Sequence, residues 1–168
     1  MELFETGTKM GANFSPCKKY RYSLWRTWDQ GKGHVMWIGL NPSTADETQN
    51  DPTVRRCIGF AQRWGYGGIY MMNLFAFRAT DPKVMQAQTD PVGPGNDEHL
   101  AAYAMNSKII VAAWGAFDCT VDRGAKVINH LMLFGITTLH CLGQSKNGHP
   151  KHPLYVPYSQ PLVEWRMK

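Results

Sequence analysis

The sequence predicts an α/β fold: a three-layer α/β/α sandwich around a mainly parallel four-stranded sheet, with an N-terminal antiparallel hairpin. Continuous apolar runs favour strands that are buried on both faces, as in a parallel sheet. Helical segments between these runs make successive strands parallel. A length of 168 residues is that of one ordinary domain, 1–168, in which residues 1–18 form an N-terminal arm.

The first half of the chain contains the hairpin and two of the parallel strands. Residues 19–28 alternate in polarity and form a strand, which the turn 29–33 joins as a hairpin to the buried run 35–40. Asp51 before Pro52 is a helix N-cap followed by proline at the first helical position, so we expect a helix from there to about residue 64.

The second half repeats the alternation of strands and helices. The run 69–75 is the second parallel strand, and a proline-containing loop over 78–95 follows it. Asn96 and the two acidic residues after it cap the next helix. The remaining elements are a helix over 96–105, a strand over 108–115, a helix over 119–134, a strand over 136–142 and a short closing helix over 157–165.

Two asparagines occur at the ends of the first two parallel strands. Asn41 ends the first, because Pro42 lacks an N–H group and stops the strand, and Asn73 falls near the end of the second. Open α/β sheets bind ligands at this edge. An amide offers a donor and an acceptor together, as reading a base edge or a carboxamide requires. The alternative is that each asparagine merely punctuates a turn.

The exit of the last parallel strand is rich in polar residues and should open on the same side. It contains two His-Pro pairs, at His149 and His152, together with Lys146 and Lys151. Each histidine either acts in the site or is a loop residue without a chemical role.

Composition limits the partners. The net charge of +5 and pI near 9.1 favour approach to a polyanion, and the aromatic residues suit base stacking, although core aromatics and solubilising lysines explain both equally well. No window approaches the roughly 18 apolar residues of a membrane span, and the N-terminus lacks a signal-peptide pattern. We expect a cytoplasmic protein without a membrane partner.

The four cysteines are widely spaced, with no Cys-x-x-Cys pair. This spacing argues against a zinc or iron–sulfur site, so we expect reduced thiols, no metal and no cofactor. The oligomeric state is not predicted.

Several short motifs, taken in order, resemble those of the uracil-DNA glycosylase superfamily. They are Gly39-Leu40-Asn41-Pro42, Asn73, Trp114-Gly115 and His152-Pro153-Leu154. The whole chain is more similar to an uncharacterised bacterial and phage family known as a domain of unknown function, with its Asn-Pro-Ser-x-Ala-Asp, Asn-Leu-Phe and His-Pro-Leu-Tyr blocks.

The resemblance implies a uracil-DNA-glycosylase-like fold and an enzyme that cleaves the N-glycosidic bond of a modified or damaged base in DNA. Asn41 would activate the attacking water, His152 would stabilise the departing base anion and Asn73 would bind the base edge. The base must be flipped out of the stack, which needs a pocket and a wedge. The other residues implicated are Leu40, Pro42 and Ser43 beside the base, Arg55, Arg56, Lys146 and Lys151 on phosphates, and Leu154 as the wedge.

Two alternatives to this function stay open: an enzyme acting on a small nucleotide or nucleoside, and a non-catalytic nucleic-acid-binding module. Asp46, Asp51 and His149 are candidates for an additional site. The two acids either perform chemistry, bind a metal or cap the following helix, and for Asp51 the cap is favoured.

Overall fold

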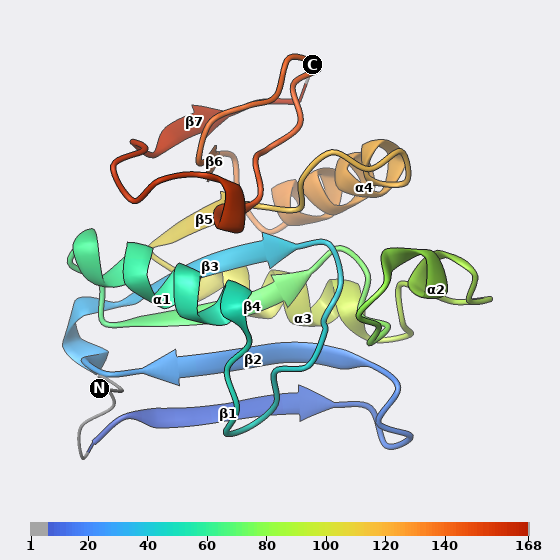
Figure 1. Ribbon diagram of the computed structural model, residues 1–168, viewed down its shortest axis with the longest axis horizontal. Coiled ribbons are helices and arrows are strands. Elements are labelled where there is room, and N and C mark those ends of the chain that lie inside the picture. Colours follow the sequence, from blue (N-terminus) through green and yellow to red (C-terminus); the bar gives the residue numbers. More distant parts are fainter. Residues whose placement is uncertain (1–6, 168) are drawn as a thin grey trace.

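A seven-stranded sheet forms the centre of the computed structural model, which describes residues 7–167 (Figure 1). The strand order is β1-β2-β4-β3-β5-β6-β7. Strands β4, β3, β5 and β6 are mutually parallel, whereas β1, β2 and β7 run antiparallel to their neighbours. The strands are β1 (Lys9–Phe14), β2 (Arg21–Thr27), β3 (His34–Gly39), β4 (Gly68–Asn73), β5 (Ile109–Ala112), β6 (Leu139–Cys141) and β7 (Val163–Trp165).

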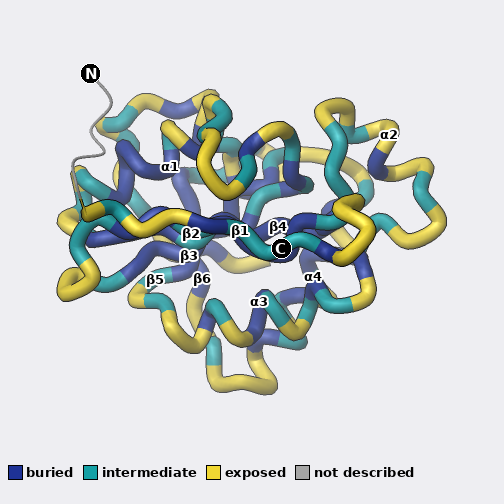
Figure 2. Tube along the Cα trace, turned by 90° about the horizontal axis from the view of Figure 1, so that it is seen from below, coloured by how far each residue is buried: buried dark blue, intermediate teal, exposed yellow. Residues whose placement is uncertain are grey.

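Helices cover both faces of the sheet. They are α1 (Pro52–Arg63), α2 (Pro82–Gln86), α3 (Asn96–Met105) and α4 (Thr120–Met132), with 3-10 turns η1 (Gln30–Lys32) and η2 (Pro153–Tyr155). Helix α1 lies on one face and α3 and α4 lie on the other (Figure 2).

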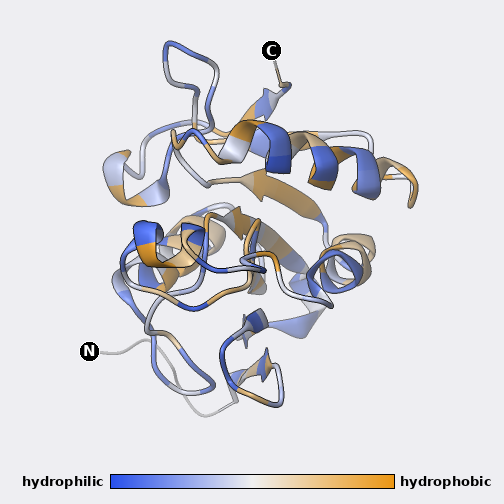
Figure 3. Ribbon diagram, turned by 90° about the vertical axis from the view of Figure 1, so that its right-hand side faces the viewer, coloured by the Kyte–Doolittle hydropathy of each residue, from blue (hydrophilic) through white to orange (hydrophobic). Residues whose placement is uncertain are grey.

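Two hydrophobic cores result from this layering. Trp37 of β3 packs with Phe60 on the α1 side, whereas its neighbour Met36 belongs to the core on the α3 and α4 side. This alternation follows from the two-residue period of a strand. The hydrophobic strands are visible between the helices in Figure 3.

The sheet has seven strands rather than the predicted four with an added hairpin. The strand predicted over 19–28 exists as β2, but it pairs antiparallel with β4 and not with β3. Its hairpin partner is β1, which lies inside the predicted N-terminal arm 1–18. Residues 1–6 of that arm lie outside the described residues. Alternating polarity identifies a strand but does not specify its neighbour. The predicted pairing of the strand 19–28 with the run 35–40 was therefore wrong.

A β-bulge interrupts the pairing of β1 with β2. Asn13 lies opposite Ser23 and Phe14 lies opposite Arg21, so Tyr22 is an extra residue on β2. Tyr22 and Ser23 both contact side chains of α3, whereas Arg21 contacts the loop that follows β3, on the α1 side. Bulges re-aim side chains in this way, and here the bulge turns Arg21 towards the carboxyl edge of the parallel strands.

The end of the chain also differs from the prediction. A closing helix over 157–165 was expected, but this segment contains the strand β7, which pairs antiparallel with β6. Its Trp165 packs edge-on against Trp114, with ring centroids 5.1 Å apart, and its indole N–H donates to the Gly148 carbonyl at 3.0 Å. These contacts are long-range, so local periodicity could not reveal them.

Candidate functional site

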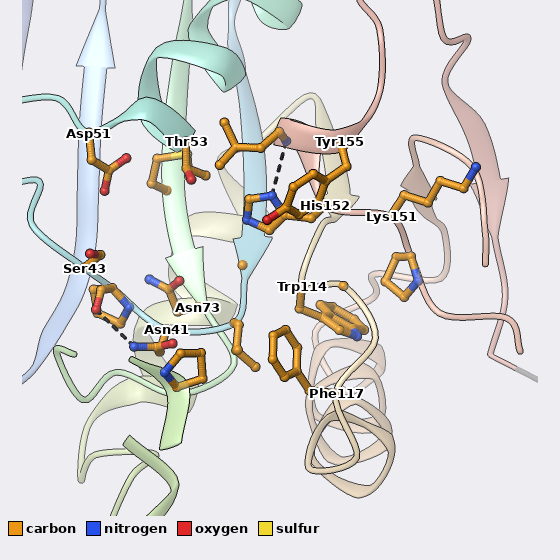
Figure 4. Close-up of a pocket in the computed structure, with 18 of the residues that line it drawn as sticks. Asn41, Ser43, Asp51, Thr53, Asn73, Trp114, Phe117, Lys151, His152 and Tyr155 are labelled. Atoms are coloured by element: carbon orange, nitrogen blue, oxygen red, sulfur yellow. Dashed lines mark hydrogen bonds between the residues drawn. The ribbon is translucent and has the colours of Figure 1, made fainter. Parts of the chain in front are cut away.

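A cleft of about 710 Å³ opens at the carboxyl ends of β3, β4 and β5 (Figure 4). The loop before η2 and the start of α1 form its other walls. The predicted site residues that line it are Leu40, Asn41, Pro42, Ser43, Asp51, Asn73, His149, Lys151, His152 and Leu154. Those that do not are Asp46, Arg55, Arg56 and Lys146.

Asn41 connects two loops at the cleft floor. Its amide nitrogen donates to the carbonyl of Ala79 at 2.8 Å and to that of Pro42 at 3.1 Å, and it lies 3.4 Å from the Phe77 carbonyl. The loop after β4 is thereby attached to the loop after β3. Within residues 7–167 no hydrogen bond reaches the Asn41 Oδ1, so towards a ligand the side chain offers an acceptor.

Asn73 ends β4 and is buried. Its side chain lies over Gly39 of the adjacent strand, where a Cβ atom would come within 3.0 Å of the Asn73 Oδ1. Glycine at 39 therefore makes room for this amide. The Asn73 Nδ2 is buried and has no hydrogen-bond partner in the part of the chain that the structure describes. Leaving a buried donor unpaired costs about 1–3 kcal/mol, so an acceptor on a ligand that reaches this amide would be bound favourably.

The backbone around Asn73 is held from the opposite layer. Asn96 donates from Nδ2 to the carbonyls of Asn73 at 3.0 Å and Leu74 at 3.1 Å. Arg123 of α4 donates from Nε to the same Leu74 carbonyl at 2.8 Å and forms an ion pair with Asp97. Helix α3 begins after Gly95 without a side-chain cap. The prediction that Asn96 caps this helix was therefore wrong, because its amide binds β4.

His152 presents a single N–H to the cleft. Its Nδ1 accepts a hydrogen bond from the backbone N–H of Leu154 at 3.2 Å, so in the neutral ring the proton lies on Nε2. Burial lowers the pKa of His152, and the nearby Asp51 carboxylate opposes this shift. In Figure 4 the ring lies within the cleft, next to Tyr155. The arrangement provides a neutral hydrogen-bond donor near pH 7.

The two acids of the 46–51 segment have different surroundings. Asp51 caps α1, as predicted, by accepting from the Val54 N–H at 2.9 Å, and it also lines the cleft. Asp46 accepts from the backbone N–H groups of Thr48 and Gln49 at 3.0 and 2.8 Å. These bonds lower its pKa. Asp46 therefore stabilises its own loop outside the cleft, and only Asp51 is placed for chemistry.

Arg21 lines the cleft, although the sequence analysis did not select it. Only 3% of the residue is exposed. Its Nη1 donates to the Ala45 carbonyl at 3.1 Å, whereas its Nε is buried without a partner among the described residues. Burial lowers its pKa to about 10, with Asp51 acting in the opposite direction, so it stays charged at neutral pH. An arginine inside an aromatic strand, between Tyr20 and Tyr22, was the sequence signal.

The four predicted phosphate contacts differ in availability. Arg56 donates from Nε to the Pro153 carbonyl at 3.1 Å and from Nη2 to the Val156 carbonyl, and it lies 3.8 Å from the centre of the Tyr158 ring. It thus attaches α1 to η2, and these contacts contradict the prediction that Arg56 is available for a phosphate. Lys146, Lys151 and Arg55 are exposed.

Exposed apolar side chains surround the mouth of the cleft. Leu154 and Tyr155 of η2 are 41% and 83% exposed, and Phe117, in the loop after β5, is 39% exposed. Gly115, with φ +77°, lies between Phe117 and His152, since a Cβ there would be 3.7 and 3.8 Å from these side chains. In Figure 4 Tyr155 lies beside His152 and Phe117 lies below them; the His152 and Tyr155 ring centroids are 5.6 Å apart and the rings are tilted by 51°. Phe117 was not predicted from the sequence.

Residues 7–167 contain no cluster of three histidine, cysteine or acidic side chains placed to hold a metal ion. The cysteines at 17, 57, 119 and 141 are not in disulfides. None of the described helices has the length and apolar character needed to cross a membrane.

The family model DUF1643, described as a protein of unknown function, matches residues 21–154. The chain belongs to this family. The matched region begins at Arg21 and ends at Leu154, so it contains every residue that lines the cleft except Tyr155. Neither a curated protein nor a solved structure gives a significant match to the chain.

Proposed function

We propose that this DUF1643 protein is a base-recognising hydrolase that cleaves the N-glycosidic bond of a modified or damaged base in DNA. One observation supports this most: Asn73, whose buried Nδ2 has no partner among the described residues, lines the same cleft as His152 with its neutral ring. Two uncharged donors suit the carbonyl oxygens of a base, and both strengthen as negative charge develops on it.

The chemistry assigns one role to each side chain. The oxygen of a water molecule bonds to C1′ of the sugar, and the bond from C1′ to the base nitrogen breaks, leaving its electron pair on the base. His152 donates from Nε2 to a carbonyl oxygen of the departing anion. Asn41 accepts one O–H of the attacking water through Oδ1, and the Asp51 carboxylate takes the proton that the water loses. Asp51 also stabilises the cationic sugar.

Exposed residues at the mouth support DNA as the substrate. Leu154 and Tyr155 project from η2 beside the cleft, where an apolar side chain would wedge into the stack that a flipped base leaves. Arg55, Lys146 and Lys151 are exposed and provide charges for phosphates.

A free nucleotide or nucleoside is the second candidate substrate. The observation in its favour is the scarcity of cations: of the described lysines and arginines, only Arg21 and Lys151 line the cleft. A duplex normally meets a broader basic rim.

The first experiment screens purified protein against duplexes that carry single modified bases, scored for abasic sites, and against nucleosides and nucleotides, scored for free base. On the substrate found, Asn41→Ala and His152→Ala should slow the chemical step by about 100-fold while binding changes little. Asn73→Ala should also lose discrimination between bases. His130→Ala, outside the cleft on α4, is the control.

If none of these substrates releases a base, the proposed function is rejected. If a base is released and neither Asn41→Ala nor His152→Ala slows its release more than a few-fold, the proposed roles are wrong.

The salt dependence of duplex binding separates the two substrates. Replacing Arg55 and Lys146 together by alanine should weaken binding to every duplex and reduce the salt slope by about one unit for each lost phosphate contact. Lys83 and Lys126, exposed on α2 and α4, give a matched control pair. Binding and slope unchanged from the wild type would favour the free nucleotide.

A further inference from the structure

Arg21 is a cation that the proposed chemistry leaves unused. Among the described residues its guanidinium makes one hydrogen bond, from Nη1 to Ala45, and neither Nε nor Nη2 has an acceptor. Burying a charge is expensive unless hydrogen bonds replace the lost water.

Asp51 influences Arg21 but does not neutralise it by contact. The carboxylate supports the charged form of Arg21 through space, yet the ion pairs found within residues 7–167 do not include these two residues. The Nε and Nη2 positions are adjacent in the planar guanidinium, and together they match two oxygens of a phosphate or carboxylate.

A neutral donor accompanies Arg21 in the lining of the cleft. Thr53 lines the cleft from the first turn of α1, where backbone N–H groups have no acceptor within the helix. The start of α1 carries the positive end of the helix dipole, which favours an anion, although the Asp51 cap offsets part of it.

We propose that Arg21 binds a phosphate of the substrate nucleotide through Nε and Nη2, next to the pocket that takes the base. The assignment rests on the proposed function only in placing a base beside the anion. Two sources supply this phosphate: the 5′-phosphate of a free nucleotide, or a phosphodiester of a DNA strand on either side of a flipped base.

Calorimetric titration of the wild-type protein tests the proposal directly. The probes are the common deoxynucleosides, their 5′-monophosphates, and single-stranded trideoxynucleotides without terminal phosphates. For a base that the cleft accepts, the phosphate-bearing probe should bind roughly 10- to 100-fold more tightly than the nucleoside, as expected for charge-assisted hydrogen bonds. Tighter binding of the monophosphate identifies the free nucleotide, and tighter binding of the trinucleotide identifies the strand.

Arg21→Met, which keeps the length of the side chain but removes the charge, should abolish this difference and leave nucleoside affinity within about threefold. Arg78→Met is the matched control. Arg78 also has a buried Nε without a partner in the described structure and stacks 4.5 Å from the centre of the Phe14 ring, but it does not line the cleft. This control should retain the full difference.

Arg21→Lys provides a second test if Arg21→Met does not fold. It retains the charge but not the fork, so it should lose most of the preference for phosphate. Inorganic phosphate should raise the thermal unfolding temperature of the wild type more than that of Arg21→Lys.

Equal binding of nucleoside and phosphate-bearing probes to the wild type, or the absence of all phosphate-dependent binding, would overturn the assignment. A preference that persists in Arg21→Met and Arg21→Lys would overturn it too. An Arg21-dependent preference without base release from any substrate would reject the proposed function and keep the anion site. Base release without an Arg21-dependent preference for phosphate would keep the proposed function and reject the anion site.

Discussion

The two ends of β2 each bury an arginine, and the two arginines differ in what they contact. Arg26 donates five hydrogen bonds, to backbone carbonyls of β1, β2 and the loop before α1 and to the Asn50 side chain. Arg21 donates one. Both guanidinium groups lose hydration on burial, but only for Arg26 do hydrogen bonds within the described chain replace most of the lost water. We infer that Arg26 belongs to the fold and that Arg21 belongs to the cleft, so hydrogen bonding distinguishes them where burial does not.

The largest expected effect on stability comes from replacing Arg26. Arg26→Met should lower the free energy of unfolding by about 3–5 kcal/mol, because it leaves buried carbonyls without donors. Arg21→Met should change it by less than about 1 kcal/mol, since one hydrogen bond is lost. Denaturant unfolding monitored by circular dichroism measures both. Equal destabilisation by the two substitutions would remove the distinction between the arginines.

The same contrast exists between two buried asparagines: Asn73, which ends β4, and Asn96 of α3, which binds the backbone at that strand end. Asn96→Ala should destabilise the protein by about 2 kcal/mol, because two carbonyls lose their donor. Asn73→Ala should cost less than about 1 kcal/mol or be neutral, because the Asn73 Nδ2 makes no hydrogen bond to the described residues. Urea denaturation of both variants gives the two values. A larger loss for Asn73→Ala would show that its amide has a structural role.

The smallest expected effect is a pH dependence that concerns His152. Burial holds its folded-state pKa below the usual 6.5, so below about pH 6.5 the unfolded chain takes up a proton that the folded chain resists. This contribution to stability is complete above 6.5 and declines as the pH falls towards the folded-state pKa. His152→Gln should flatten this part of the stability profile. Denaturant unfolding between about pH 5 and 7.5, the interval in which histidines titrate, measures the effect.

His34 is the comparison for this experiment. Burial also lowers its pKa, but its Nε2 is bound to the Thr27 hydroxyl at 2.7 Å, far from the cleft. A ligand that accepts a hydrogen bond from His152 should change the pH dependence of stability in the wild type. The same change should occur in a His34→Gln variant, because His34 does not contact the ligand. A profile in which His152→Gln matches the wild type would contradict the burial argument.

Local signals in the sequence predicted much of the fold. Apolar runs located β3, β4 and β5, and Asp51 before Pro52 located the start of α1 with its cap. Strand neighbours and the strand β7 depend on contacts between distant segments, so the hairpin and the closing helix were predicted incorrectly.

The candidate site was predictable where a polar residue lies at the end of a parallel strand or in the loop after it. Asn41 and Asn73 were selected at strand ends, and His152 was selected from the loop after the last parallel strand and from the motif resemblance; the structure places all three in one cleft. Arg21 was missed because strict alternation groups it with Ser23, and only the bulge at Tyr22 separates the two. Arg56 was misjudged because its carbonyl partners lie near the other end of the chain.

The attachment of β4 to the far layer has a consequence for how the cleft responds to a ligand. The carbonyl groups at the end of β4 are held by Asn96 of α3 and Arg123 of α4, while the side chain of Asn73 faces the cleft. The two helices behind the sheet thus restrain the backbone of Asn73 and Leu74, and a ligand bound to the Asn73 side chain would restrain the same strand end. Occupation of the cleft should therefore slow amide hydrogen exchange in the first turn of α3, a region that the ligand itself does not reach.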